Sequence, residues 1–205
     1  MFINLKDKKC VFIGGGNVAS RKIETLIGFG SKIKVISLKA CPKIEELAIQ
    51  NKLELILREY RDGDTLGAYM VFAATSDRAL NHRVYEEAVR ENIPVNVADC
   101  PYECTFIFPS IVKRDKLVVG ISTSGIYPAL SKMVRQKIEA ILPESLNNSM
   151  EILKHFREKA ALIKSEEKRK SFIVQTMDLV LGCGDDDLKV VIEKIQDLLL
   201  EYIEI

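Results

Sequence analysis

Short apolar runs alternate with segments of helical periodicity through the first hundred residues. The apolar runs predict strands at 10–13, 32–37, 53–57, 69–74 and 94–98, and the run at 69–74 (YMVFAA) is apolar almost throughout, as in a strand buried on both faces. Helical spacing predicts helices over 17–29, 43–51 and 77–91. Alternating strands and helices predict an α/β fold with a doubly wound, Rossmann-like parallel sheet, which binds ligands at the carboxyl ends of its strands.

The pattern changes after residue 99. Two strand-like runs, 105–112 (TFIFPSIV) and 116–122 (KLVVGIS), predict a hairpin turned at 113–115, and Pro109 inside the first run argues for an edge strand or a bulge. An apolar hairpin beyond a complete sheet needs a partner surface. A second copy of the chain is the simplest one, so we predict a homodimer.

Helices fill the rest of the chain. One begins at Pro128, and its expected buried stripe consists of Leu130, Met133, Val134, Ile138 and Ile141. Further helices are predicted over 146–163, 168–181 and 187–203. We therefore expect a nucleotide-binding domain over 1–112, a dimerisation segment over 113–145 and a helical C-terminal domain over 146–205.

Three glycines stand where the first strand becomes a helix, in the stretch VFIGGGNVASRK at 11–22. The spacing Gly14-x-Gly16-x-x-Ala19 is the dinucleotide-binding pattern: a tight turn at Gly14, close approach of a diphosphate at Gly16 and close helix packing at Ala19. The helix that follows offers free N–H groups to an anion. A glycine-rich structural turn is the competing interpretation.

Polar residues also follow two later strands. Thr75, Ser76 and Asp77 come after the fourth strand, and Asp99 after the fifth. Because parallel strands end at one edge of a sheet, these residues and the glycines should share one crevice. We expect the glycines to hold the middle of a dinucleotide and Asp99 to lie near its reactive end.

Composition narrows the classes of function. A net charge of +1 over 205 residues gives no sign of nucleic-acid binding, and no run of 18 apolar residues suggests a membrane span. The start of the chain shows no signal peptide, and five scattered cysteines fit reduced thiols, so we expect a cytoplasmic protein. With two histidines and a C-x-x-x-C spacing we expect no metal site; Asp185–Asp187 fit the first turn of a helix better than a metal site.

Four stretches together resemble the precorrin-2 dehydrogenase and sirohydrochlorin ferrochelatase family, the sirohaem synthase N-terminal type. They are VFIGGGNVASRK, FAATSD with Asn81, VNVADCPYECTFIFPSIV and VVGISTSGIYPALSKMVRQKIE. The resemblance implies an NAD-dependent oxidation of precorrin-2 to sirohydrochlorin in sirohaem biosynthesis. It also implies dimerisation through the segment after the nucleotide domain and, in some members, insertion of iron. Larger homologues carry a methyltransferase domain, which we do not expect in these 205 residues.

The resemblance also implies roles for individual residues. Asp99 matches the family's important aspartate, and the nucleotide loop and its neighbouring turn match Gly14, Gly16, Asn17, Val18 and Thr75. A Ser-Ser-Gly-Gly run of some members is here Ser122-Thr123-Ser124-Gly125, so Thr123 and Ser124 are candidates for substrate binding.

The implied chemistry suits these residue types. Oxidation sends a hydride to nicotinamide and a proton to a base, which makes Asp99 the candidate catalytic group; a turn cap is its competing interpretation. A tetrapyrrole with eight carboxylates requires cations, for which Lys132 and Arg135 are candidates; an ordinary solvated basic face is the competing interpretation and is favoured for each residue taken singly.

The residues leave NAD against NADP open. NAD sites usually carry an acidic residue after the second strand, but no Asp or Glu lies between Ser31 and Ile44. Ser37 can bond a ribose hydroxyl, and Lys39 can welcome a 2′-phosphate; the resemblance implies NAD. An alternative function for the same motif is a regulatory subunit that senses nucleotide without catalysis.

Overall fold

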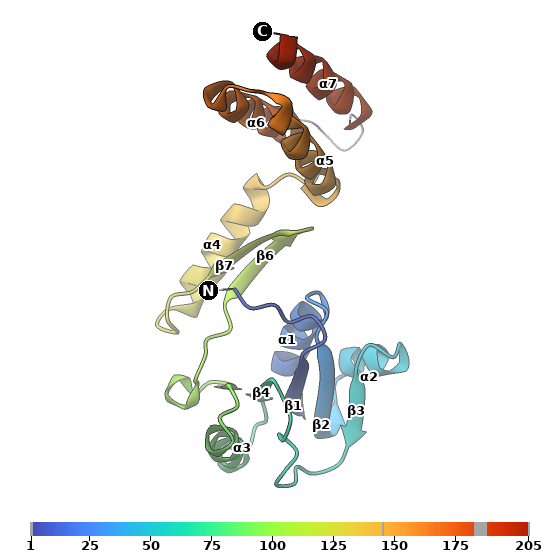
Figure 1. The fold of residues 1–205 in the computed structure, drawn as a ribbon. Coiled ribbons are helices and arrows are strands. Elements are labelled where there is room, and N and C mark those ends of the chain that lie inside the picture. The colour runs from blue at the N-terminus through green and yellow to red at the C-terminus, as the bar shows by residue number, and fades with distance from the viewer. Residues whose placement is uncertain (1, 145, 183–187, 205) are drawn as a thin grey trace. The chain divides into compact units, whose positions relative to one another are not determined.

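Strand β1 (Lys9–Gly15) is the middle strand of a five-stranded parallel sheet in the order β3-β2-β1-β4-β5 (Figure 1). In this computed structural model, which describes residues 2–144, 146–182 and 188–204, the other strands are β2 (Lys32–Ala40), β3 (Glu54–Leu57), β4 (Met70–Ala73) and β5 (Val95–Val97). The strand order reverses between β1 and β4, where doubly wound sheets bind their ligands. The predicted Rossmann-like sheet is confirmed.

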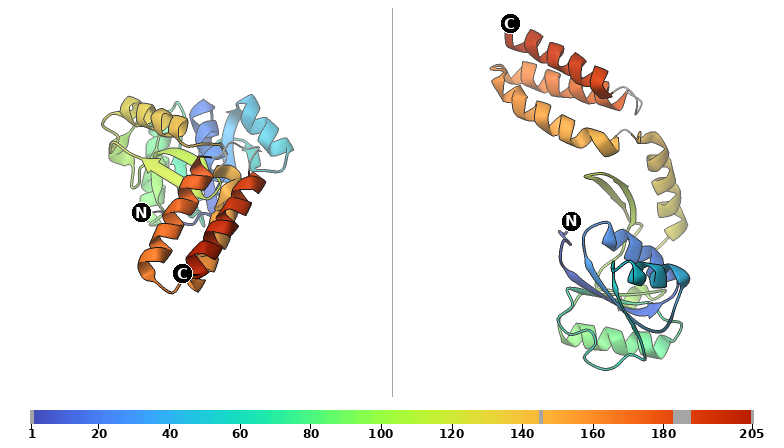
Figure 2. Two further views of the ribbon diagram at one scale, coloured as in Figure 1. Left: turned by 90° about the horizontal axis from the view of Figure 1, so that it is seen from above. Right: turned by 90° about the vertical axis from the view of Figure 1, so that its right-hand side faces the viewer.

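Helices cover both faces of this sheet (Figures 1 and 2). On one face, α1 (Asn17–Ile27) and α2 (Pro42–Ile49) pack through Ile23 and Ile44, both fully buried; on the other, α3 (Arg78–Arg90) packs through Val84 and Ala88. Strand β4 is buried along its whole length, as its apolar sequence predicts for a strand covered on both faces.

The predicted strand over 105–112 is wrong in its first half. After β5 the chain forms a short 3₁₀ turn, η1 (Pro101–Glu103), and then runs irregularly until a strand begins at Ser110. Phe106 and Phe108 pack edge-on against Phe72 of β4, at centroid distances of 5.5 and 5.8 Å. Two aromatic residues packed inward at alternate positions imitate the period of a strand without pairing as one.

A second compact unit begins at Pro109. It contains the antiparallel hairpin β6 (Ser110–Arg114) and β7 (Leu117–Ile121), then α4 (Pro128–Ile141), α5 (Leu146–Lys159), η2 (Ala160–Leu162), α6 (Glu166–Leu181) and α7 (Leu188–Glu204). The hairpin turns at Asp115, whose φ is +49°, so Lys113 and Arg114 belong to a strand and not to the predicted turn. The last helices share a core of Phe156, Phe172 and Ile195.

Helix α4 begins at Pro128, as predicted, but its predicted buried stripe is only partly correct, since Val134 and Ile138 are half-buried and the other three residues are exposed. Leu130 and Met133 remain 42% and 46% exposed and Ile141 77%, while the buried residue of the helix is Ser131. The Ser110 hydroxyl donates to that of Ser131 at 3.3 Å, so small polar groups join α4 to the hairpin at this point. Among the described residues, Leu130, Met133 and Ile141 thus leave apolar surface of α4 exposed.

The remaining predictions concern the division into domains, the acidic run at 185–187 and membrane spans. Contacts divide the chain between Phe108 and Pro109, and the three-part division at 112 and 145 stays a prediction. Cys183 and Asp185–Asp187 lie outside the described residues. Within the described part of the chain, no helix has the length and apolar character that crossing a bilayer requires.

Candidate nucleotide and reaction site

Each glycine of the β1–α1 turn meets a different steric demand. Gly14 has a φ of +110°, and a Cβ there would lie 2.4 Å from the Ala74 carbonyl oxygen of β4's end. A Cβ on Gly15 would lie 2.7 Å from the Lys39 carbonyl oxygen. A Cβ on Gly16 would meet nothing within 4 Å. The first two glycines let neighbouring backbones approach, and the third leaves open space beside the turn, as a bound diphosphate requires.

The first turn of α1 is arranged to receive an anion. Gly16 is the N-cap and provides no side-chain cap, and no acidic residue stands in the first turn. The N–H groups of this turn therefore remain available, with the positive end of the helix dipole behind them. Ala19 is fully buried against the sheet, while Asn17 and Val18 are exposed at the turn.

A cavity of about 820 Å³ lies over this turn. Four segments line it: the glycine turn at 14–16, the end of β2 at 36–41, residues 58–60 after β3, and residues 74–83 around the start of α3. Its volume is in the range of cofactor sites. Gly14, Gly16, Ser37 and Thr75, predicted to bind cofactor, all line this cavity. The Ser37 hydroxyl donates to the Lys39 carbonyl oxygen at 2.7 Å, so it is left with acceptor capacity for a ligand.

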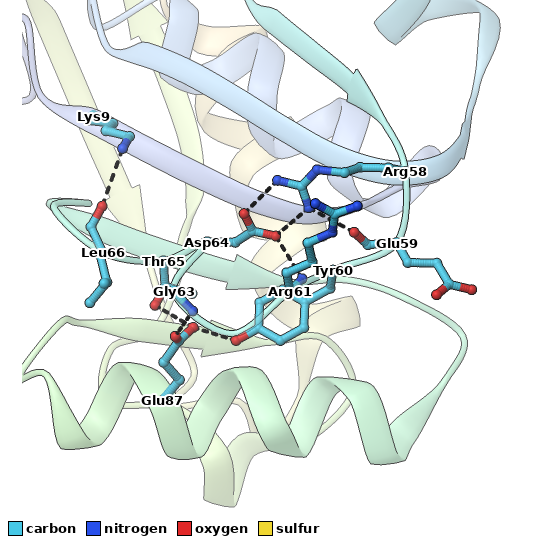
Figure 3. A network of polar contacts seen from close by, with 10 residues as sticks. All are labelled: Lys9, Arg58, Glu59, Tyr60, Arg61, Gly63, Asp64, Thr65, Leu66 and Glu87. Atoms are coloured by element: carbon cyan, nitrogen blue, oxygen red, sulfur yellow. Dashed lines mark hydrogen bonds and ion pairs between the residues drawn. The ribbon is translucent and has the colours of Figure 1, made fainter.

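The wall after β3 is held by a buried carboxylate that the sequence did not reveal (Figure 3). Glu87 of α3 is 4% exposed and accepts hydrogen bonds from the Tyr60 hydroxyl, the Thr65 hydroxyl at 2.7 Å and the Gly63 N–H. Burial and this carboxylate together raise the pKa of Tyr60, so its phenol stays protonated as a donor.

A second contact fixes the same segment. Arg58 donates two bonds of 2.7 Å to the two oxygens of Asp64, and this pairing lowers the pKa of Asp64 (Figure 3). The partners of Glu87 lie 22 to 27 residues away from it in the chain, and the Arg58–Asp64 pair lies within an irregular loop. Hydrophobic periodicity therefore could not predict either network.

The turn after β4 is locked by Asn81, which is 5% exposed. Its amide oxygen accepts from the Thr75 hydroxyl at 2.7 Å and from the Thr75 N–H at 3.2 Å, and its amide nitrogen donates to the Thr75 carbonyl oxygen at 3.1 Å. Asp77 caps α3 by accepting from the N–H groups of Ala79 and Leu80. These hydrogen bonds fix the turn after β4, which lies between the cavity over the glycine turn and a second cavity.

Asp99 lines the second of these cavities, of about 380 Å³, and not the first. The two share Thr75 and Ser76, and the second is also lined by Arg78 and Glu103. Asp99 is exposed, with a φ of +59° just after β5, and its carboxylate makes no hydrogen bond to any residue that the structure describes. The predicted common crevice is thus two adjoining cavities along the carboxyl edge of the sheet.

Two further side-chain contacts tie α1 to β5 and α3 to η1. Burial lowers the pKa of Lys22, whose ammonium donates to the Asn96 side-chain oxygen at 2.5 Å and lies 5.6 Å from the Phe72 ring centroid. His82 contacts Glu103 at 2.8 Å and ties η1 to α3. That hydrogen bond raises the pKa of His82. Neither contact was predicted, because residues 74 and 21 positions apart share no local pattern.

The residues predicted to bind substrate all lie in the second unit. Thr123 accepts the Tyr127 N–H through its hydroxyl at 3.2 Å, and the Ser124 N–H donates to the Ser122 hydroxyl at 3.0 Å. Lys132 is exposed, and Arg135 is paired with Glu139 at 2.5 Å. Their role in binding stays a prediction. Among the described residues, no three His, Cys, Asp or Glu side chains are grouped to hold a metal ion.

Comparison with known proteins identifies the nucleotide-binding half. Residues 1–110 match the model of the NAD_binding_7 family, described as "Putative NAD(P)-binding". The chain belongs to this family. The match covers the whole parallel sheet and both cavities, so the geometry and the family agree on a dinucleotide site.

Curated relatives confirm the resemblance that the motifs carry. The chain is 36% identical over 179 residues to a siroheme synthase of Photorhabdus laumondii, which covers 87% of the chain and 38% of that protein. It is 37% identical over 173 residues to a siroheme synthase of Neisseria meningitidis serogroup C, covering 84% of the chain and 36% of that protein. The chain thus spans well under half the length of these relatives.

A solved structure confirms the fold along the full chain. The chain superposes on SirC, a precorrin-2 dehydrogenase, with a TM-score of 0.73 over 100% of this chain and 98% of that one, at 21% sequence identity. The order of parallel sheet, hairpin and C-terminal helices is therefore an arrangement found in a solved protein.

Proposed function

We propose that this protein oxidises precorrin-2 to sirohydrochlorin with NAD as the hydride acceptor. One observation carries the proposal: a cavity over an anion-ready glycine turn adjoins a second cavity that holds the uncommitted carboxylate of Asp99. The similarity to siroheme synthases supports the choice of substrate.

The glycine turn and its cavity suit the binding of the cofactor. The N–H groups at the start of α1 would hold the diphosphate beside Gly16, where no side chain intrudes. The adenosine half would occupy the larger cavity, and the rigid Thr75 turn would direct the nicotinamide end toward the smaller one. Bound NAD supplies the hydride acceptor.

Asp99 would take up the proton that leaves with the hydride. A general base must be free to reach its proton, and the carboxylate of Asp99 faces a cavity without a hydrogen-bond partner among the described residues. A turn cap would accept a nearby N–H, as Asp77 does. This contrast favours the catalytic interpretation of Asp99 over the structural one.

The substrate's carboxylates need cations. We infer that Lys132 and Arg135 bind them, with Thr123 and Ser124 placing the macrocycle; Arg135 would exchange its Glu139 partner for a substrate carboxylate. We further propose a cytoplasmic homodimer. The uncovered apolar side of α4, with Leu130, Met133 and Ile141, supports a second copy as its cover.

The test is turnover and binding of precorrin-2 by the purified full chain. With NAD present, the proposal predicts conversion to sirohydrochlorin and one NADH per substrate, followed by their absorbance. A protein that binds NAD tightly yet neither binds nor converts the tetrapyrrole would instead be a nucleotide sensor, and the proposal would be wrong.

A further inference from the structure

The end of β2 carries a lysine, Lys39, where NAD sites usually carry an acidic residue. Three basic residues line the larger cavity on this side: Lys39, Arg58 and Arg83. An acidic residue at the end of the second strand normally bonds the adenosine ribose hydroxyls, whereas a cation nearby accommodates a 2′-phosphate. The charge at this edge therefore bears directly on which dinucleotide the site accepts.

Two of these cations already have carboxylate partners. Arg58 forms its two-pronged pair with Asp64, and Arg83 donates to Asp62 at 2.9 Å. Lys39 is exposed, and its ammonium makes no hydrogen bond or ion pair with any residue in the described ranges. Lys39 is thus the group on this wall best able to meet a new anion.

The backbone places Lys39 beside the diphosphate turn. Gly15 pairs with Ala40, the Cys41 N–H donates to the Gly15 carbonyl oxygen at 2.8 Å, and a Cβ on Gly15 would lie 2.7 Å from the Lys39 carbonyl oxygen. The adenosine ribose is joined directly to the diphosphate. Its 2′ position therefore belongs at this segment.

We propose that the site accepts a 2′-phosphate on the adenosine ribose, with Lys39 as the residue that holds it, so that the chain binds NADP about as well as NAD. This rests on the proposed function and sharpens it. The phosphate gains a charge-assisted contact from Lys39, and it meets no carboxylate on β2, which is free of Asp and Glu along its length.

One carboxylate on the same wall argues the other way. Glu59 lines the cavity, is exposed, and points away from the Arg58–Asp64 pair (Figure 3). It follows β3, which pairs with the outer side of β2, so it lies one strand further from the glycine turn than Lys39 does. If Glu59 nevertheless bonded the ribose hydroxyls, the site would prefer NAD, and Glu59→Gln would weaken NAD.

Calorimetric titration of the full chain with NAD and NADP tests the proposal. The wild type should bind both within about threefold. Lys39→Gln should weaken NADP about fivefold and leave NAD unchanged, as expected for an exposed ion pair. Lys39→Arg should retain NADP affinity, and Lys52→Gln, an exposed lysine outside the cavity, is the matched control. Raising salt should weaken NADP binding in the wild type more than in Lys39→Gln.

The outcomes separate this inference from the proposed function. Binding of NAD with NADP more than about tenfold weaker, or an NADP-to-NAD ratio that Lys39→Gln does not move, overturns the inference and leaves the dehydrogenase proposal standing. Failure of both nucleotides to bind removes the nucleotide site, and with it the proposed function.

Discussion

Replacing Glu87 should destabilise the nucleotide-binding unit far more than a surface carboxylate would. The side chain is buried, and three donors from the 60–65 segment converge on it. In Glu87→Ala, two buried hydroxyls and one N–H lose their acceptor, and each costs about 1–3 kcal/mol when left unpaired. Water entering the vacated space recovers part of this, so we expect a loss of about 4 kcal/mol.

Smaller changes in the same network should have graded effects. Tyr60→Phe removes one donor and leaves the carboxylate two others, so a loss of about 1–2 kcal/mol is expected. Glu87→Gln keeps the side-chain volume but places an N–H₂ group against one of the donors. Its loss of stability should lie between those of Tyr60→Phe and Glu87→Ala. Because Tyr60 and Glu87 are in contact, the double variant Tyr60→Phe with Glu87→Ala should show a coupling energy of about 1–3 kcal/mol.

The assay must separate the two compact units, since a global melting curve would mix them. Hydrogen exchange followed by mass spectrometry does so: amides of β1 and β4 should exchange about a thousandfold faster in Glu87→Ala, while those of α6 stay unchanged. Glu91→Gln, exposed at the end of the same helix, is the control, expected within about 0.5 kcal/mol of wild type. A loss below about 1 kcal/mol in Glu87→Ala would show that this carboxylate does not hold the 60–65 segment in place.

Three other predictions use single features of the molecule. Leu130→Glu with Met133→Glu should convert a dimer to a monomer in light scattering, because both would place charge on the uncovered side of α4; a dimer of unchanged mass would contradict this. His82, one of two histidines, should titrate by NMR with a pKa above 6.5, and Glu103→Gln should lower that pKa. His82 then stabilises the fold at low pH, and that stabilisation is lost as pH rises through its folded pKa. A pKa of His82 that Glu103→Gln does not change would refute the pairing. The metal insertion implied by the resemblance predicts that the protein accelerates entry of Fe²⁺ or Co²⁺ into sirohydrochlorin, and a rate equal to the spontaneous one contradicts it.

The sequence predicted the elements whose pattern is local. The strand at YMVFAA and the glycine turn were predictable because burial on both faces and a positive φ each leave a residue-level mark. Gly15 is explained only by the approach of Lys39 from another strand. Phe106 and Phe108 misled because inward packing on Phe72 shares the period of a strand.

Contacts between residues far apart in the chain could not be predicted from hydrophobic periodicity. Helical spacing correctly predicted α4, but a stripe of apolar residues does not say what covers it, and Met133 stays 46% exposed among the described residues. Likewise Glu87 looks like an ordinary helix surface residue in sequence, since its partners lie 22 to 27 residues away. Asp99 was predicted at the correct edge of the sheet. Its place in a separate cavity depends on the turn at Thr75, which is hydrogen-bonded to Asn81 and lies between the two cavities.

We propose that the glycine turn binds the cofactor while Asp99 performs the proton transfer from a neighbouring cavity. The most direct measurement compares Asp99→Ala with wild type in NADH formation from precorrin-2, with the NAD dissociation constant determined on the same samples. Asp99→Ala should reduce turnover by at least about a hundredfold and preserve NAD affinity, as expected for loss of a general base. Turnover near the wild-type rate would contradict it.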